Sequence, residues 1–360
     1  MIDRKKYQRV EILMGRIFIF VIVLAISLYV VEMVSRLFIS ARPPIEKRFP
    51  VQYYRQPQPY TMFSGQPQFR DLNPLGYRGK APRIPKPEDE YRIVFLGGST
   101  VLLGEPPISI LVENIFQKNG YPRVKTYNFG VLSSVSGMEL AKIVFEVQKF
   151  APDMIVMYNG GNDILHPISW DPRPGYPFNF ITYENNPILD EDINSYPTTA
   201  LLMYGSNILR VTFRSYFVKK FIPLKKVREE YKYGSPAWKE KIAETYIGNI
   251  VNAAKISRTF GAEFIAFFQP LLYYKNVSCI SRQEKRFFRN KEGKTVRAIR
   301  TIIAREIKEA RQKYGVDIVD LSSVYSNESS WIFLDSAHTR QAAKPMIVKA
   351  IYANLADELN

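Results

Sequence analysis

The sequence has 360 residues, of which 46% are hydrophobic and 14% aromatic, enough to build the core of one large domain or two small ones and too apolar for a disordered chain. The formal net charge of +16 favours an anionic neighbour, such as an acidic glycan, nucleic acid or a phospholipid surface, but charge alone does not choose among them. A single cysteine, Cys279, excludes an intrachain disulfide, a CxxC motif and a cysteine-based metal cluster.

A long apolar segment lies near the N-terminus. Residues 17–31 carry no charged side chain, and with their apolar flanks they reach the roughly 20 residues that span a bilayer. A cleavable signal peptide is the alternative, but its apolar part is typically only ~7 to 15 residues long. Basic residues at positions 4, 5, 6, 9 and 16 favour a cytoplasmic N-terminus, although basic residues also follow the segment. We therefore predict that residues 1–40 form a cytoplasmic tip and a transmembrane anchor, with the remainder in the periplasm or outside the cell.

The next fifty residues are rich in proline. Ten of the 24 prolines fall within residues 41–90, at positions 43, 44, 50, 57, 59, 67, 74, 82, 85 and 87. Proline lacks a backbone N–H and is excluded from the interior of regular structure. This composition predicts an extended juxtamembrane linker over residues 41–90, parts of which, such as residues 72–80, pack on the domain that follows.

From residue 91 onwards, apolar runs of strand length alternate with stretches of helical spacing. The runs are residues 93–96, 124–131, 154–158, 264–268 and 316–321, and the helical stretches are 107–118, 137–150, 242–258, 282–313 and 341–359. This alternation predicts a mainly parallel sheet with helices on both faces, because parallel strands need crossover connections and bury both sides. In such a sheet the reactive groups gather at the carboxyl ends of the strands.

Three of the expected strands end in turns that contain glycine, and a fourth polar pattern lies before the last helix. These segments are Gly97-Gly98-Ser99-Thr100, Asn128-Phe129-Gly130, Asn159-Gly160-Gly161-Asn162-Asp163, and the Asp335–His338 pair. Taken singly, each has a structural interpretation: Ser99 or His338 as a helix cap, and Asp163 as a turn carboxylate that bonds backbone. Taken together, they place a serine, an asparagine, an aspartate and a histidine at one edge of the sheet.

In order and position, these four segments resemble the sequence blocks of the SGNH (GDSL) hydrolase superfamily, over roughly residues 91–357. The resemblance implies a flavodoxin-like three-layer α/β sandwich with a mainly parallel five-stranded sheet. It also implies Ser99 as the nucleophile, His338 as its base and Asp335 as the residue that orients His338, because a serine hydroxyl is a weak nucleophile without a base. The oxyanion donors would be the backbone N–H groups of Ser99 and Gly130 and the side-chain amide of Asn162. No metal or other cofactor is expected.

Two residues depart from the family pattern. Gly98 stands where the family has aspartate before the nucleophile, and Thr339 follows His338 where leucine is common. The Gly-Gly-Ser-Thr version, together with residues 75–79 (LGYRG) and Gln269-Pro270, resembles a membrane-anchored subgroup. The second histidine, His166, has no acidic residue placed as Asp335 is before His338. It is therefore interpreted as a loop residue or a substrate contact and not as the base.

Residues 164–241 are more than a crossover requires and predict an insertion in the catalytic domain of residues 91–360. Its first half is aromatic and proline-rich, which suggests a cap. There the side chains of Trp170, Tyr176, Phe178 and Tyr183 either stack on sugar rings or pack the loop onto the domain. Residues 210–241 contain ten lysines and arginines against three glutamates, which favours contact with anionic lipid or an acidic polysaccharide, or a solvated helix face.

A second basic stretch, residues 282–313, contains Glu284, Glu306 and Glu309, which we expect to pair with basic neighbours at helical spacing. Nucleic acid is not an expected partner, because an exported domain would not meet it and the sequence contains no recognised binding module.

We therefore predict a membrane-anchored serine esterase that acts on ester-linked acyl groups, foremost O-acetyl groups of a carbohydrate. Its substrate would be an acylated small molecule or glycan. Two alternatives stay open: an O-acyltransferase with the same triad, and a protein without catalytic activity that binds glycans or acts as a scaffold. The sequence does not indicate the oligomeric state.

Overall fold

The computed structural model describes residues 4–38, 56–69, 71–178, 180–184, 205–209, 212 and 223–359. The chain divides into two compact units. The anchor unit comprises Met1–Phe49 and Ile181–Pro223, and the sheet unit comprises Pro50–Phe180 and Leu224–Asn360. This division differs from the expected domains, because the sheet unit takes in most of the proline-rich stretch and only the middle of the insertion belongs to the anchor unit.

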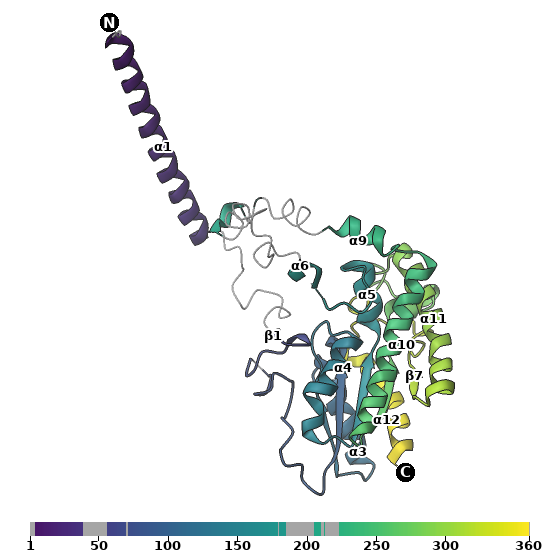
Figure 1. Cartoon of the computed structure of the whole chain (residues 1–360). Coiled ribbons are helices and arrows are strands. Elements are labelled where there is room, and N and C mark those ends of the chain that lie inside the picture. Colours follow the sequence, from purple (N-terminus) through teal and green to yellow (C-terminus); the bar gives the residue numbers. More distant parts are fainter. Residues whose placement is uncertain are drawn as a thin grey trace. The chain divides into compact units, whose positions relative to one another are not determined.

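The anchor unit contains helix α1 (Arg4–Phe38), drawn in purple in Figure 1. Residues Tyr7–Phe38 are long and apolar enough to cross a membrane, a property of length and composition that a signal sequence would share. The side chains described along this helix are almost all exposed in the structure.

One carboxylate of α1 has partners far along the chain, within the same unit. Glu32 accepts hydrogen bonds from the backbone N–H of Asn207 at 2.7 Å, from the hydroxyl of Ser206 at 2.8 Å and from the N–H of Ile208 at 3.3 Å. Arg36 donates to the same carboxylate at 2.8 Å. A charged group in an apolar helix is costly unless it is paired. Segment 205–209 supplies hydrogen-bond donors to Glu32 that the apolar side chains of α1 cannot supply.

The sheet unit is built on five parallel strands. They are β3 (Tyr91–Gly97), β4 (Val124–Asn128), β5 (Met154–Asn159), β6 (Glu263–Phe268) and β7 (Ile318–Asp320), hydrogen-bonded in the order β4-β3-β5-β6-β7. In register, Phe95 of β3 lies between Asn128 of β4 and Val156 of β5. This is the flavodoxin-like order, and it confirms the predicted parallel sheet and all five strands. A separate antiparallel pair joins β1 (Gln56–Gln58) to β2 (Met62–Ser64).

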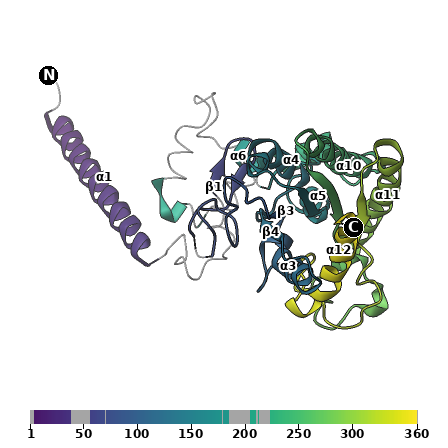
Figure 2. The same ribbon diagram turned by 90° about the horizontal axis from the view of Figure 1, so that it is seen from below.

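Helices cover both faces of this sheet, which confirms the predicted three layers (Figure 2). Helices α3 (Ile108–Lys118) and α12 (Lys344–Leu359) cover one face, and α4 (Ser136–Phe145), α10 (Pro236–Thr259) and α11 (Asn290–Tyr314) the other. Side chains alternate along β3: Ile93 and Phe95 belong to the first core cluster, and Val94 and Leu96 to the second.

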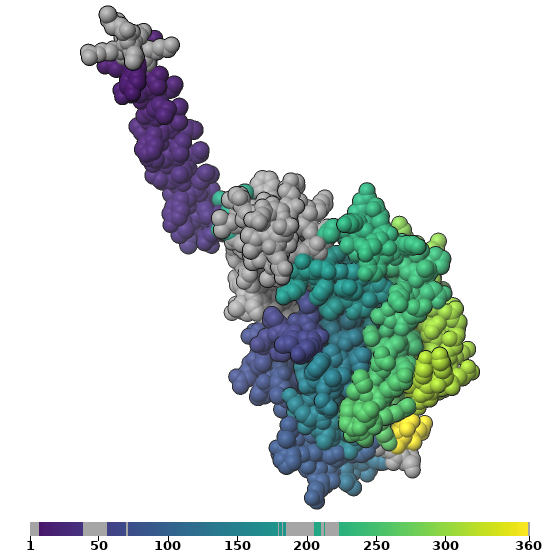
Figure 3. Space-filling view, viewed as in Figure 1, coloured from purple at the N-terminus to yellow at the C-terminus, as the bar shows by residue number. Residues whose placement is uncertain are grey.

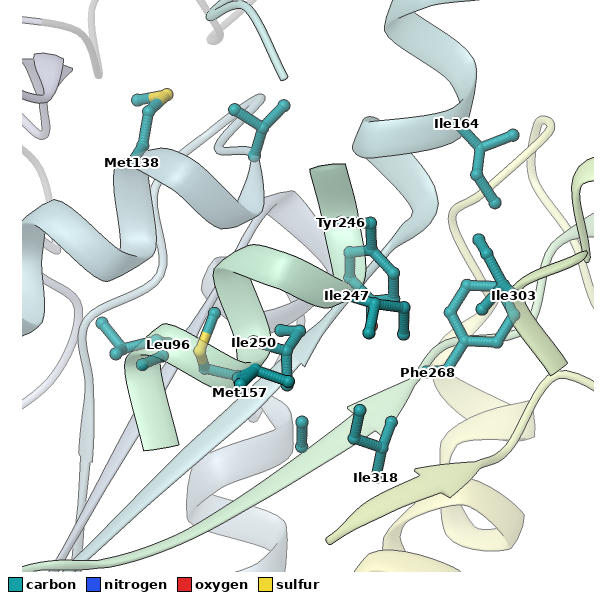
Figure 4. Packing of buried hydrophobic residues seen from close by; sticks show 14 of the residues in the cluster. Leu96, Met138, Met157, Ile164, Tyr246, Ile247, Ile250, Phe268, Ile303 and Ile318 are labelled. Carbon is teal, nitrogen blue, oxygen red and sulfur yellow. The ribbon is translucent and has the colours of Figure 1, made fainter. Parts of the chain in front are cut away.

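The second cluster is the larger core. Leu96 of β3 and Met157 of β5 are fully buried there with Tyr246 and Ile250 of α10 (Figure 4). Each large apolar side chain buried in this way contributes about 1.5–3 kcal/mol. On the outside, the side chains of α10 and α11 form adjoining bands on the surface of the sheet unit, green and yellow-green in Figure 3.

Two helices begin elsewhere than expected. Helix α10 starts at Pro236, before the expected residue 242, because the Ser235 hydroxyl accepts the N–H of Trp238 at 3.2 Å and caps the helix. Helix α11 starts at Asn290, after the expected residue 282, and ends at Tyr314, where Gly315 with a left-handed φ of 59° forms the C-cap. Glu284 thus lies outside α11. Its expected pairing on that helix is wrong, whereas Glu306 and Glu309 do pair with Arg305.

The described part of the proline-rich stretch packs on the sheet unit. Phe63, Leu72 and Tyr77 are buried, and the Tyr77 ring lies 4.2 Å from that of Phe129. Residues 56–69 and 71–90 are therefore part of the sheet unit and not a free linker. Among the described residues, the other helices are α2 (Ser99–Leu102), α5 (Gly161–Ser169), α6 (Phe180–Glu184) and α9 (Leu224–Glu230), with 3-10 turns η3 (Val147–Phe150), η4 (Leu272–Tyr274), η5 (Val277–Cys279) and η6 (Gln341–Ala343).

Candidate active site

Residues from three chain segments meet at the carboxyl edge of the sheet. Ser99 follows β3 and opens α2, and the loop with Asp335 and His338 precedes α12. These three residues line one cavity of about 430 Å³, together with Tyr158 near the end of β5. This volume lies within the range of small-molecule sites, about 300–1,000 Å³.

The hydroxyl of Ser99, the ring of His338 and the carboxylate of Asp335 form a continuous chain of hydrogen bonds. His338 Nε2 is 2.6 Å from Ser99 Oγ, and His338 Nδ1 is 2.6 Å from Asp335 Oδ2. Because the carboxylate can only accept, this network assigns the ring proton to Nδ1 and leaves Nε2 free to accept the serine proton.

Asp335 is held by its own backbone neighbours. Its Oδ1 atom accepts the N–H groups of Ala337 and His338, each at 2.8 Å. Burial by itself would raise the pKa of Asp335, but the hydrogen bond from the His338 ring and those from these two N–H groups lower it below its ordinary value. The carboxylate is therefore ionised at neutral pH, as an orienting group must be.

The loop that carries Asp335 and His338 is fixed at its base by Glu284. This buried carboxylate accepts the backbone N–H groups of Ile332 at 3.0 Å and Phe333 at 2.9 Å, and it pairs with the ammonium of Lys275 at 2.8 Å. Burial would raise the pKa of Glu284, but Lys275 and the backbone donors lower it overall. The sequence does not reveal this role of Glu284, since nothing in the local pattern links it to residues some fifty positions later.

Asn162 lies beside the turn that carries the nucleophile. Its Nδ2 donates to the carbonyl oxygen of Ser134 at 2.7 Å. A Cβ atom on Gly98 would lie 2.5 Å from that Nδ2 and 3.6 Å from the Ser134 oxygen. Glycine at position 98 is therefore what allows the amide to approach the backbone just before Ser99.

Gly130 does not have the arrangement expected of an oxyanion donor. Its N–H donates to Asn128 Oδ1 at 2.9 Å, inside the protein. A Cβ atom there would lie 2.7 Å from the backbone nitrogen of Leu102, so glycine is needed for packing against α2 and not for access of a substrate. The turn that reaches Asn162 comes slightly later, at Ser133, whose φ of 60° is left-handed, and Ser134. A left-handed serine has no signal in the sequence.

A buried polar network lies behind Asn162. Asp163 accepts the hydroxyl of Ser136 at 2.5 Å and its N–H at 3.0 Å, while Glu139 accepts the side-chain amide of Asn159. Burial raises the pKa of Asp163 to about 6. Burial, together with the charge of Asp163, raises the pKa of Glu139 to about 8. Asp163 thus bonds backbone, as its turn position indicates, and ties α5 to the start of α4.

The other residues singled out in the sequence lie outside this cavity. His166 is buried on α5 and its ring packs 5.5 Å from that of Phe178. The Tyr176 ring packs under the Arg173 guanidinium, whereas Trp170 and Tyr183 are exposed. Much of the basic stretch 210–241, namely 210–211 and 213–222, lies outside the described residues. In the part that the structure describes, no three His, Cys, Asp or Glu side chains are grouped so that they could hold a metal ion.

Comparison with known proteins yields structural likeness only. No protein-family model and no curated protein matches the chain. Among solved structures, it is similar to an acetyl xylan esterase (11% identity over 73% of this chain and 98% of that one, TM-score 0.44) and to a GDSL-like lipase from Bacteroides thetaiotaomicron (12%, 78% and 93%, 0.41). An acetylxylan esterase from Geobacillus stearothermophilus has 10% identity over 73% and 93%, with a TM-score of 0.42. Likeness at this level carries no conclusion about activity.

Proposed function

We propose that the chain is a serine esterase of the SGNH type that removes ester-linked acyl groups through an acyl-serine intermediate. The observation that carries this proposal is the unbroken relay from Ser99 Oγ through both ring nitrogens of His338 to Asp335, with each step 2.6 Å long. A cap or a packing contact would need only one of these bonds, whereas proton transfer from a nucleophile needs both.

In the first half-reaction, Ser99 Oγ attacks the ester carbonyl carbon and His338 Nε2 takes the hydroxyl proton. The new C–O bond gives a tetrahedral intermediate, which collapses as the alcohol oxygen leaves with the proton from Nε2. Asp335 stabilises the imidazolium while it exists and keeps the ring in place. The products are a free alcohol and an acylated Ser99.

The negative charge on the carbonyl oxygen needs donors that are already oriented. The backbone N–H of Ser99 is one, and the second N–H of the Asn162 amide is another, because the first is occupied by the Ser134 carbonyl. Losing one such donor costs about 10²–10³ in kcat. Gly130 is not included, since its N–H already has the Asn128 oxygen as acceptor.

In the second half-reaction, a hydroxyl group resolves the acyl-serine. Water gives up a proton to His338 Nε2 and attacks the acyl carbon, which releases a carboxylic acid and restores Ser99. A sugar hydroxyl in place of water would give an acyltransferase with the same residues. We favour hydrolysis of O-acetyl groups on a carbohydrate, which is what the family resemblance implies. With α1 as the anchor, the site would lie on the extracytoplasmic side of a membrane.

The test uses the full chain in detergent with 4-nitrophenyl acetate, with and without an oligosaccharide acceptor. The variants are Ser99→Ala and, as a control, Ser278→Ala, which removes an exposed serine. Acetate release that is lost in S99A and kept in S278A supports the esterase. Acetylation of the oligosaccharide would identify a transferase. Equal behaviour of wild type and S99A on every ester would leave a glycan-binding or scaffold role.

A further inference from the structure

A lysine lies in the wall of the cavity that contains Ser99. Lys344 is the first residue of α12, six positions after His338, and it lines the same cavity as Ser99 and His338. Its exposed fraction is only 6%. Lysine is almost never buried to this extent without a partner of opposite charge, so its environment requires an explanation.

The hydrogen bonds of Lys344 leave its charge without a direct counterion. Its Nζ donates to the Leu103 carbonyl oxygen at 2.7 Å, which uses one of three N–H donors. Among the described residues, Lys344 forms no salt bridge. The nearby carboxylate of Glu105 is bound to the Arg78 guanidinium instead. Burial and then the charge of Arg78 lower the pKa of Lys344 to about 8, so the amine is still mostly protonated at neutral pH.

The amine is held in place by the backbone that it touches. A Cβ atom on Gly104 would lie only 1.8 Å from Lys344 Nζ and 3.1 Å from Gln341 Oε1. Gln341 in turn accepts the N–H of Glu105 and donates to the Pro106 carbonyl. Residues 103–106 therefore form a fixed wall against which the ammonium rests, so binding a ligand there costs little side-chain ordering.

Apolar residues in the wall of the cavity strengthen the electrostatic attraction of the Lys344 ammonium for an anion. Leu103, Ile108 and Leu334 contribute apolar surface to the same cavity. An ammonium beside apolar walls attracts an anion more strongly than one in bulk water, because the local dielectric constant is low. Two carboxylates, Asp335 and Glu105, also line the cavity, but the first is bonded to His338 and the second to Arg78. Lys344 has no such direct ionic partner, so the cavity suits a substrate that carries both an ester and a negative charge.

We propose that Lys344 binds a carboxylate of the acylated substrate, so that the enzyme prefers acylated acidic sugars, such as uronic acid residues, over neutral ones. This inference rests on the proposed esterase function. The net charge of +16 acts in the same direction, since it attracts polyanionic chains to the protein. If Lys344 only supports the Leu103 wall, its loss would reduce activity on charged and neutral substrates alike.

The experiment compares two substrates that differ only in charge: an acetylated trigalacturonate and its fully methyl-esterified derivative. Acetate release by the full-length protein gives kcat and KM for both. We expect wild type to favour the acidic substrate about tenfold in kcat/KM, mainly through KM. In Lys344→Gln this preference falls to about one. In Lys344→Arg, which keeps the charge, part of it remains.

The matched control is Lys349→Gln, which removes an exposed lysine from the same helix and keeps the wild-type preference. Equal rates of wild type on the two substrates, or an unchanged preference in K344Q, would overturn the proposal. If no ester is cleaved at all, the proposed esterase fails, and binding still tests Lys344. Calorimetric titration of unacetylated trigalacturonate should then give binding that is lost in K344Q, and binding of equal strength in both proteins would refute it.

Discussion

Ser99 and His338 lie 239 positions apart in the chain and yet share a hydrogen bond. Each could be found in the sequence because each lies next to a regular element whose end marks the site: Ser99 after a buried strand, and His338 just before the last helix. The relay between them is therefore a consequence of the parallel sheet, which brings strand ends to one edge. The local sequence pattern does not predict the orientation of individual backbone N–H groups.

Asp335→Asn tests the orienting role at this scale. The amide can donate where the carboxylate could only accept, so the wrong His338 tautomer becomes favourable and Nε2 carries the proton. We expect kcat on 4-nitrophenyl acetate to fall by about 10³–10⁴, with KM nearly unchanged. Thermal unfolding of the variant checks that the fold is kept. A variant with more than a tenth of wild-type kcat would contradict the relay.

Glu139 gives a pH dependence whose sign follows from its raised pKa. Its pKa is about 8 in the folded protein against an ordinary value of 4.5. Between these values the unfolded chain releases a proton that the folded protein keeps, so the free energy of unfolding falls as pH rises from 4.5 to about 8. Glu139→Gln removes this loss. We expect E139Q to gain in melting temperature over wild type more at pH 9 than at pH 5.

The control for this prediction is Glu309→Gln, which replaces an exposed carboxylate on α11. Its melting temperature relative to wild type should show no comparable change between pH 5 and pH 9. A wild-type protein whose stability rises steadily from pH 5 to pH 9 would disagree with a buried, protonated Glu139.

Two residues, Gly130 and Glu284, make contacts that differ from those predicted from the sequence. Gly130 was expected to donate to an oxyanion, but its N–H is occupied by Asn128, and its lack of a side chain serves packing against α2. Glu284 was expected on a helix surface but is buried under the catalytic loop. The sequence pattern singles out both Gly130 and Glu284 but does not predict the contacts that each makes, because those contacts involve groups that only the fold brings near.

The sequence pattern predicts all five strands of the sheet, since unbroken apolar runs are what a doubly covered sheet requires. Helix ends were less accurate. The start of α10 depends on the Ser235 cap. Helix α11 starts late because residues 281–284 bind Lys275 and the loop that carries Asp335 and His338. The periodicity of apolar residues predicts neither the Ser235 cap nor the contacts of residues 281–284.

Glu284→Gln should destabilise the protein strongly, because the Lys275 ammonium, only 2% exposed, would lose its counter-charge. We expect a loss of about 3–5 kcal/mol in the free energy of unfolding by urea. The same carboxylate binds the base of the loop that carries Asp335 and His338, so if the proposed function holds, kcat should fall in the fraction that stays folded. Lys275→Met with Glu284→Leu should recover stability but not kcat, which separates the charge from the loop contact.

Within the anchor unit, α1 and segment 205–209 should be close in the full-length protein in solution as they are in the structure. Asn207 Nδ2 lies 3.3 Å from the hydroxyl of Ser35. In a Cys279→Ser background, we expect Ser35→Cys with Asn207→Cys to form an intrachain disulfide on mild oxidation, seen as a shift on a non-reducing gel. Ser27→Cys with Asn207→Cys, two turns away on the same helix, is the control and should stay reduced.

For the whole molecule, the sole cysteine offers a test of membrane orientation. Cys279 lies in the sheet unit on η5 and is partly exposed. If α1 crosses the membrane with its N-terminus in the cytoplasm, an impermeant maleimide added to intact spheroplasts should label Cys279. A second variant, Arg4→Cys with Cys279→Ser, should be labelled only after lysis. The reverse pattern would place the sheet unit in the cytoplasm.

The pairing of Glu32 with Asn207 has a practical outcome for anyone who trims the chain. Deleting α1 to obtain a protein without the apolar helix would also delete the acceptor for the backbone N–H groups of Asn207 and Ile208 and for the Ser206 hydroxyl. A shortened protein that starts after residue 49 would therefore keep segment 205–209 without the Glu32 carboxylate that accepts its hydrogen bonds. An excision that follows the compact units removes residues 181–223 together with the helix, so that Glu32 and its partners are deleted as one unit.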